Sequence, residues 1–289
     1  MKPGKLTIFI ALLLCSSLLS GYSTSIKASK DYKFTLDIMR KLSIIMKNFP
    51  NEENKKTYEK VQTLFRDASE KYYSREFTKS YQQYKMLKKQ LIILLESLSY
   101  EYLKRSKRIL DSVSKESFDI LINFSKQSSF ARYFRKPYDP LKDVKPYNKK
   151  YTAKDYHFFK DKTLIEAYIK NGYKKYKKSK LLFEDKEIAR LKQLKKISDY
   201  NINHIINNYL ISIQLCREAK QLGLEIFKLK NIHQLGDIMK KYNLPGNKIT
   251  PIFDDRIPEK FKVDAVDNQN LVLEIEKERK KKILDLQKQ

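Results

Sequence analysis

The sequence predicts an all-α protein, and three observations lead to that prediction. Glycine and proline, which interrupt helices, number only 6 and 8 among 289 residues, whereas residues that favour helices abound. Apolar residues recur at intervals of three and four, as on the buried face of a helix. A proline-rich stretch separates two groups of such segments. We therefore expect a helical bundle or an irregular helical-hairpin array in two lobes, with an ordered Pro/Tyr-rich connecting segment.

The first 25 residues have the layout of a secretory signal peptide. Two lysines precede an apolar run from Leu6 to Leu14, and small residues follow. The run is shorter than the roughly twenty residues of a membrane-spanning helix. We therefore expect residues 1–25 to direct export to the periplasm or cell envelope, with no transmembrane helix in the mature chain. Lipidation at Cys15 is the disfavoured alternative, because Leu14 stands where lipoprotein signals carry a small residue.

The N-terminal helical lobe is expected at residues 31–128, as four helices with short connections. The first helix stops at Pro50, and Asn51 has a side chain suited to cap the second. A long third pattern begins near Arg75, and Ser114 is expected to cap a shorter fourth helix. Helices of this kind bury their apolar stripes against one another in a bundle.

Residues 129–162 form the predicted connector between the lobes. The connector holds three of the eight prolines, and each proline fixes φ and removes a backbone donor, so no regular helix is expected to cross it. Its aromatic side chains favour an ordered segment that lies across the helices over a flexible linker. The same side chains are candidate contacts for a protein partner. The candidate partner-binding residues are Tyr133, Tyr138, Tyr147 and Tyr151.

The C-terminal helical lobe is expected at residues 163–242, where Thr163 and Glu166 have the spacing of a capping box. Its further helices are expected over residues 186–197, 199–221 and 231–242. Residues 243–289 are expected to form an irregular tail that ends in a helix. Because the middle of that terminal helix is nearly all charged, we expect it to be helical only against a partner.

Lysine-rich helix faces are the candidate sites for polyanions. Between residues 168 and 180, helical spacing places the tyrosines on the apolar side and most lysines on the opposite side. This separation argues against a platform that stacks nucleic-acid bases, because such a platform has aromatic and basic groups on one surface. The candidate polyanion-binding residues are Lys170, Lys174, Lys177, Lys178, Arg279, Lys280, Lys281 and Lys282.

The sequence contains none of the familiar catalytic or cofactor-binding motifs. It lacks a phosphate-binding loop, a nucleophile elbow, a zinc-protease motif and paired Cys-x-x-Cys knuckles. His157 and the pair His233 and Asp237 lack the partners that catalysis or metal binding needs, and the acids at 254–259 are interpreted as a locally neutralised turn. Cys216 would be the one cysteine left after cleavage of the leader, so no internal disulfide is expected. We predict a non-enzymatic protein without a cofactor or a metal site.

A formal net charge of +27 attracts anionic partners in general and leaves three hypotheses. The preferred one is an exported interaction or scaffold protein of the bacterial cell envelope, which binds protein partners through helical surfaces. The alternative is a surface protein that binds glycosaminoglycan, an anionic envelope polymer or lipid through lysine-rich faces. The third, a cytoplasmic nucleic-acid binder, requires that the N-terminus is not a signal, and we disfavour it.

The chain resembles exported helical proteins of Borrelia-type spirochaetes. The features that carry the likeness are the leader with its "LLLCSSLLS" stretch, a body rich in lysine, isoleucine, asparagine and tyrosine, and long helices without disulfides. Many surface and periplasmic proteins of that group are lipoproteins that bind host or envelope partners. The resemblance therefore implies an envelope location and a binding role, and it assigns no functional residue.

Overall fold

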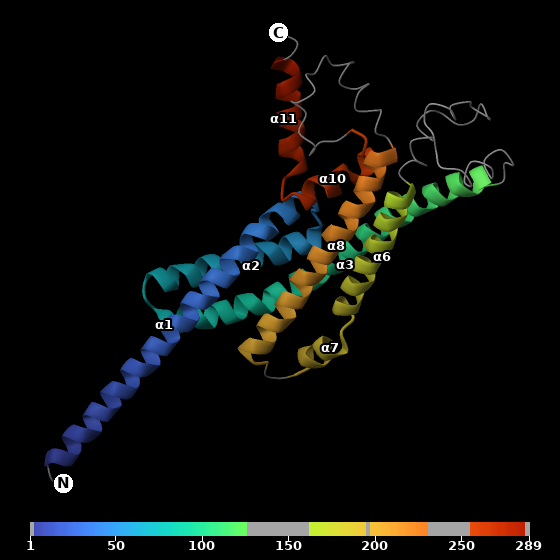
Figure 1. Cartoon of the computed structure of the whole chain (residues 1–289). Helices are drawn as coiled ribbons and strands as arrows, with labels where there is room; N and C mark the ends of the chain where they lie inside the picture. The colour runs from blue at the N-terminus through green and yellow to red at the C-terminus, as the bar shows by residue number, and fades with distance from the viewer. Residues whose placement is uncertain (1–2, 126–161, 195–196, 231–254, 287–289) are drawn as a thin grey trace. The chain divides into compact units, whose positions relative to one another are not determined.

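Helices are the only regular elements that the structure shows in its described residues (Figure 1). The computed structural model describes residues 3–125, 162–194, 197–230 and 255–286. The helices are α1 (Pro3–Asn48), α2 (Glu52–Tyr73), α3 (Phe77–Ser125), α6 (Lys162–Phe183), α7 (Lys186–Lys192), α8 (Asp199–Lys230), α10 (Glu259–Asn268) and α11 (Leu273–Leu286). The predicted all-α class is confirmed. None of the described helices is long and apolar enough to cross a membrane.

The chain folds into two compact units, and each unit is built from two separate stretches. Unit 1 comprises Met1–Leu98 and Lys186–Tyr209, and unit 2 comprises Ser99–Asp185 and Leu210–Gln289. Helices α3 and α8 contribute residues to both units. Each unit thus combines residues from before and after the predicted connector at 129–162, which itself lies outside the described residues apart from Lys162.

Unit 1 begins with the helix boundaries that the sequence predicts. Helix α1 ends at Asn48, two residues before Pro50, and the side chain of Asn51 accepts a hydrogen bond of 3.0 Å from the backbone N–H of Glu53 at the start of α2. Helix α2 ends at a tight turn in which Arg75 has a φ of 60°. The fully buried apolar side chains of unit 1 include Ile38, Leu42, Val61, Leu87, Leu91, Leu95, Ile202 and Ile205.

Unit 2 packs α6, α8 and α10 against the second part of α3 around an apolar core. The core cluster contains Ile109, Val113, Ile165, Leu224, Ile226, Phe227, Ile257, Phe261 and Ala265. Two glycines allow helices to approach α3 closely. A Cβ atom on Gly172 of α6 would lie 2.6 Å from Leu110 Cδ2, and one on Gly223 of α8 would lie 2.5 Å from Ile109 Cγ2.

Three predicted helix boundaries are wrong. Helix α3 continues past Ser114 to Ser125, because serine fits a helix interior when its hydroxyl bonds back to a carbonyl, as Ser117 does to Val113. Helix α8 continues past Gly223 to Lys230, because this glycine provides close packing rather than a helix end. Helix α7 ends at Lys192, whereas the sequence pattern extends it to residue 197.

The C-terminal region contains more helix than predicted. Helix α10 forms within a stretch that was expected to be irregular, because Pro258 starts it at the N-cap and its residues Phe261 and Ala265 reach the core. Asn270 follows with a φ of 57° and closes the helix with backbone hydrogen bonds from residues 270 and 271. Helix α11 is present in the chain by itself, so the expectation that it needs a partner to be helical is wrong.

The contact at Gly223 makes a testable contribution to stability. Replacing Gly223 by Ala should lower the free energy of unfolding by about 1–3 kcal/mol, because the new methyl group overlaps the branched, fully buried Ile109. Gly172→Ala is the matched control, because the Leu110 methyl group that it meets lies at the end of a flexible side chain. Urea unfolding of both variants measures the difference. A Gly223→Ala chain stabilised by about 1 kcal/mol, the gain expected from helix propensity alone, would contradict the contact.

Candidate functional site

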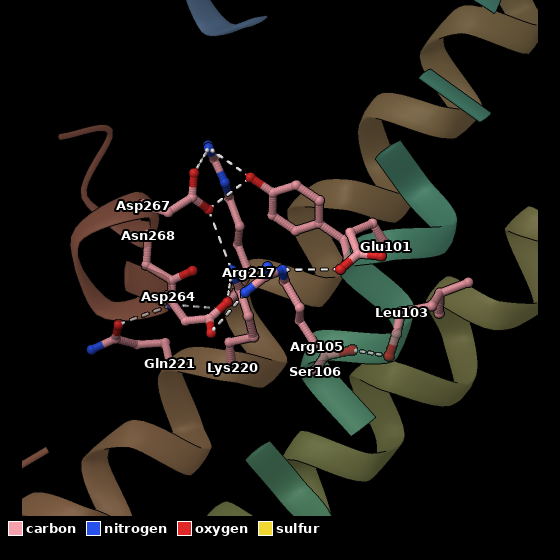
Figure 2. Close-up of polar contacts among 11 residues, drawn as sticks. Glu101, Leu103, Arg105, Ser106, Arg217, Lys220, Gln221, Asp264, Asp267 and Asn268 are labelled. Atoms are coloured by element: carbon pink, nitrogen blue, oxygen red, sulfur yellow. Dashed lines mark hydrogen bonds and ion pairs between the residues drawn. The ribbon is translucent and has the colours of Figure 1, made fainter. Parts of the chain in front are cut away.

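Helices α3, α8 and α10 of unit 2 meet at a cluster of buried charges, which we name the ionic centre (Figure 2). Residues that lie far apart in the chain come together here, each from the side of its helix that faces the other two. The ionic centre consists of Tyr102 and Arg105 of α3, Arg217 and Lys220 of α8, and Asp264 and Asp267 of α10.

The carboxylate of Asp267 accepts hydrogen bonds from three residues of the ionic centre. It accepts a hydrogen bond of 2.7 Å from the hydroxyl of Tyr102, one of 3.2 Å from Nη2 of Arg217 and one of 3.3 Å from Nζ of Lys220. The side chains of Asp267 and Lys220 are both 0% exposed. A carboxylate so deeply buried is tolerated only when cations and donors replace the water that it lost.

Asp264 lies one turn before Asp267 on α10 and shares the Lys220 cation with it. Its carboxylate accepts a hydrogen bond of 3.0 Å from Lys220 and forms an ion pair of 3.5 Å with Arg105. Arg105 also pairs with Glu101 at 3.3 Å, one turn earlier on α3. The Lys220 ammonium lies 4.5 Å from the centroid of the Tyr102 ring, a cation–π distance. The cations and anions of the ionic centre therefore neutralise one another within the fold.

Two buried carboxylates, Asp267 and Asp31, have pKa values that move in opposite directions. Burial by itself raises the pKa of Asp267, but Lys220 and Arg217 outweigh it and hold that pKa below the usual value. In unit 1, Asp31 accepts a hydrogen bond of 2.5 Å from Lys88 alone, and burial keeps its pKa above the usual value. Asp267 thus has two cations and the Tyr102 hydroxyl to offset its burial, whereas Asp31 has Lys88 and also feels the negative charge of Asp199.

Two asparagines at the end of α10 and in the turn after it form hydrogen bonds with Arg217 at the edge of the ionic centre. The side-chain oxygen of Asn270 accepts a hydrogen bond of 2.8 Å from Nη1 of Arg217, and the side-chain amide of Asn268 donates one of 3.0 Å to the backbone carbonyl of Arg217. These contacts leave the charged groups facing one another rather than a cleft. We interpret the ionic centre as the device that fixes α10 on α3 and α8.

The structure places the lysine-rich face of α6 as the sequence pattern predicts. Lys170, Lys174, Lys177 and Lys178 are exposed, whereas Tyr168, Tyr173 and Tyr176 are half-buried. The hydroxyl of Tyr173 donates a hydrogen bond of 2.7 Å to Asp111 of α3, which holds the helix with its tyrosines inward. The four lysines are thus directed to solvent, away from the aromatic rings.

The four basic residues predicted in α11 divide into two pairs. Arg279 forms an ion pair of 2.9 Å with Glu276, and Lys280 donates a hydrogen bond of 2.6 Å to Asp255. Asp255 also accepts a hydrogen bond of 2.8 Å from Lys262, so this residue of the predicted neutral turn joins α10 to α11. Lys281 and Lys282 are exposed.

The other candidate catalytic and metal-binding residues form no recognisable reactive site in the described part of the chain. Cys216 is fully buried in unit 2, with its sulfur 3.0 Å from the Ser179 hydroxyl, and burial raises the pKa of the thiol. The described residues contain no group of His, Cys, Asp or Glu that could hold a metal ion. Outside the described residues lie His157, His233, Asp237, Tyr133, Tyr138, Tyr147 and Tyr151.

The ionic centre was not predicted from the sequence. Asp264 and Asp267 lay in a stretch interpreted as irregular, so their common helix face was not considered. One sequence signal could have revealed them: two acids and two cations are separated by the same interval of three residues, which places each pair on one face of its helix. Acids three residues apart follow the apolar Phe261, and cations three residues apart, Arg217 and Lys220, interrupt the buried stripe of α8.

Removing one charge from the ionic centre should be costly. Lys220→Met should lower the free energy of unfolding by about 3–5 kcal/mol, because Asp264 and Asp267 stay buried with less compensation. Urea unfolding followed by circular dichroism measures the loss. Adding Asp267→Asn to Lys220→Met should recover part of it, since the uncompensated charge is then removed. Lys174→Met, at an exposed position, is the control, and equal stability of both single variants would refute the interpretation.

Comparison with known proteins assigns the chain to no family. No family model matches it, and no match was found among curated proteins or solved structures. The ionic centre, the lysine face of α6 and the paired helices α10 and α11 are the features from which a role can be argued.

Proposed function

We propose that the protein is a non-enzymatic, exported interaction protein of the bacterial cell envelope, and that it binds a protein partner through the outward side of α11. The leader-like N-terminus supports export. The observation that carries the binding role is the exposure of two large apolar residues, Ile275 and Leu286, on the outward side of α11.

The inward side of α11 mixes polar residues with the half-buried apolar residues Leu273, Ile283 and Leu284. Glu276 is 5% exposed, and Lys280 reaches Asp255, which also holds Lys262 of α10. Helices of soluble proteins usually direct such residues to water and bury their large apolar residues. In α11, ion pairs and a buried glutamate fix the orientation.

The outward side of α11 combines apolar and basic side chains. Ile275 is 55% exposed and Leu286 is 70% exposed. Between them, Arg279 and Lys282 lie on the same face, since the intervals of four, three and four residues follow the helical repeat. Such a face fits an apolar groove with acidic residues at its rim, in the manner of helix-in-groove recognition. A protein with an acid-rimmed groove is therefore the partner we propose.

The outward face of α11 can be tested with exposed substitutions. Ile275→Ser together with Leu286→Ser should abolish recovery of the partner in crosslinked pull-downs from intact cells, because both apolar anchors are lost. The free energy of unfolding should change by less than about 0.5 kcal/mol, as is usual for surface positions. Circular dichroism and urea unfolding check that the variant is folded.

The control uses apolar residues of matching exposure on other helices. Ile93 is 55% exposed and Leu181 is 72% exposed, so Ile93→Ser with Leu181→Ser removes the same amount of apolar surface elsewhere. This control should retain the partner. Unchanged recovery with the α11 variant, or equal loss with both variants, would count against the proposal.

A second candidate function is polyanion binding through α6. Its support is the row of exposed lysines at 170, 174, 177 and 178, which face away from the half-buried tyrosines. Lys175, by contrast, is engaged with Glu218 at 2.5 Å and is left out of this face. The ligand would be a glycosaminoglycan, an anionic envelope polymer or an anionic lipid surface, held by charge and weakened by salt.

Replacing Lys170, Lys174 and Lys177 by Gln should lower the salt concentration at which the protein elutes from immobilised heparin. The control replaces Lys55, Lys56 and Lys60 by Gln, which removes the same charge from exposed positions of α2. A polyanion site on α6 predicts a clearly larger shift for the first variant. Equal shifts would show that net charge alone retains the protein, and they would exclude this function for α6.

A further inference from the structure

An open groove runs between α1 and α2 in unit 1, with a volume of about 520 Å³. Two of its lining residues are arginines, Arg40 from α1 and Arg66 from α2. Met39 and Phe65 supply apolar surface, and Tyr58 and Gln62 add polar atoms. The groove therefore combines an apolar floor with a cation from each of the two helices that form it.

The two guanidinium groups are available to a ligand. Both arginines are exposed, and within the described part of the chain neither forms an ion pair with a carboxylate. Glu70 follows Arg66 by one helical turn, yet no ion pair joins them, and arginine before glutamate is the less favourable order along a helix. Arginine binds a carboxylate through parallel hydrogen bonds, so the pair of arginines suits an anionic ligand.

The floor of the groove is supported by stacked aromatic rings. Phe65 stacks on Tyr32 with ring centroids 6.3 Å apart, and Tyr32 stacks on Tyr72 at 5.1 Å. The hydroxyl of Tyr32 also lies 2.8 Å from that of Tyr73. Neighbouring rings restrict Phe65, so little side-chain entropy is lost when a ligand covers it. The Tyr58 hydroxyl is protonated at neutral pH and can donate a hydrogen bond, and burial raises its pKa further.

We infer that this groove binds a short acidic segment of a protein partner, in which carboxylates alternate with apolar side chains. The arginines would hold the carboxylates, and Met39 and Phe65 would receive an apolar side chain. Aromatic residues and arginine are enriched in protein interfaces, which matches this lining. A sulfated glycan would use the cations and leave the apolar floor uncovered. The open shape fits an extended segment better than a small molecule, which binds in an enclosing pocket.

The groove is a different site from the one proposed on α11. It lies in unit 1 and is basic, whereas α11 belongs to unit 2 and offers apolar residues to a groove in its partner. The inference therefore goes beyond the proposed function, and each site can fail its test without the other.

The test measures binding of the full chain to short fluorescent peptides by anisotropy. The probe peptide alternates aspartate or glutamate with leucine and phenylalanine. One control peptide has amides in place of the carboxylates, and another has serine in place of the apolar residues. The groove should bind the probe peptide at least tenfold more tightly than either control, because each control lacks one of the two contacts.

Matched protein variants locate the binding. Arg40→Gln and Arg66→Gln should each weaken binding roughly tenfold, the effect of losing one charge-assisted hydrogen bond. Lys60→Gln removes the same charge from the opposite side of α2 and should leave binding unchanged. Equal weakening by all three variants would overturn the inference in favour of general charge attraction. Equal binding of the amide peptide would overturn it as well.

A heparin-derived oligosaccharide separates the peptide from the glycan as ligand. The inference expects the oligosaccharide to bind more weakly than the probe peptide and to depend no more on Arg40 and Arg66 than on Lys60. Tighter binding of the oligosaccharide, with loss confined to the two arginine variants, would assign the groove to a glycan and refute the peptide.

Discussion

The arrangement of unit 2 depends on how Asp267 is compensated for its burial. A buried carboxylate is strongly unfavourable without cations, and Arg217 and Lys220 of α8 supply them at 3.2 and 3.3 Å. This attraction holds α10 against α8 and α3. The turn at Asn270 then leads into α11, and Asp255 joins the two helices through Lys262 and Lys280. The orientation of α11, and with it the proposed partner site, therefore follows from the ionic centre.

Most helices could be predicted because burial of apolar residues dictates their spacing. The start of α2 at Asn51 and the inward tyrosines of α6 follow from capping and from the helical repeat. Predictions from the sequence were wrong where one residue type serves two purposes. Glycine ends many helices, but Gly223 instead allows Ile109 to approach α8. Whether a glycine ends a helix or packs one is decided by a contact with a distant residue, and sequence spacing does not reveal it.

The candidate sites were predictable only where local pattern and tertiary packing agree. On α6 they agree, so its exposed lysines were identified. On α11 the sequence pattern gave no indication that Ile275 and Leu286 are exposed, whereas the contact of Lys280 with Asp255 and the burial of Glu276 place them on the outward side. The groove between α1 and α2 was missed for a similar reason, since it arises from two helices and its arginines show no pattern on either one.

Because Cys216 is buried, the rate at which its thiol reacts with a reagent depends on the motions of the helices in unit 2. The sulfur lies between α6 and α8, beside the hydroxyl of Ser179, which in turn lies 2.8 Å from that of Ser212. A sulfhydryl reagent can modify such a buried atom only when the helices packed around it separate. The rate of labelling at Cys216, measured separately from that at Cys15, therefore records how often this packing opens, and it needs no introduced cysteine.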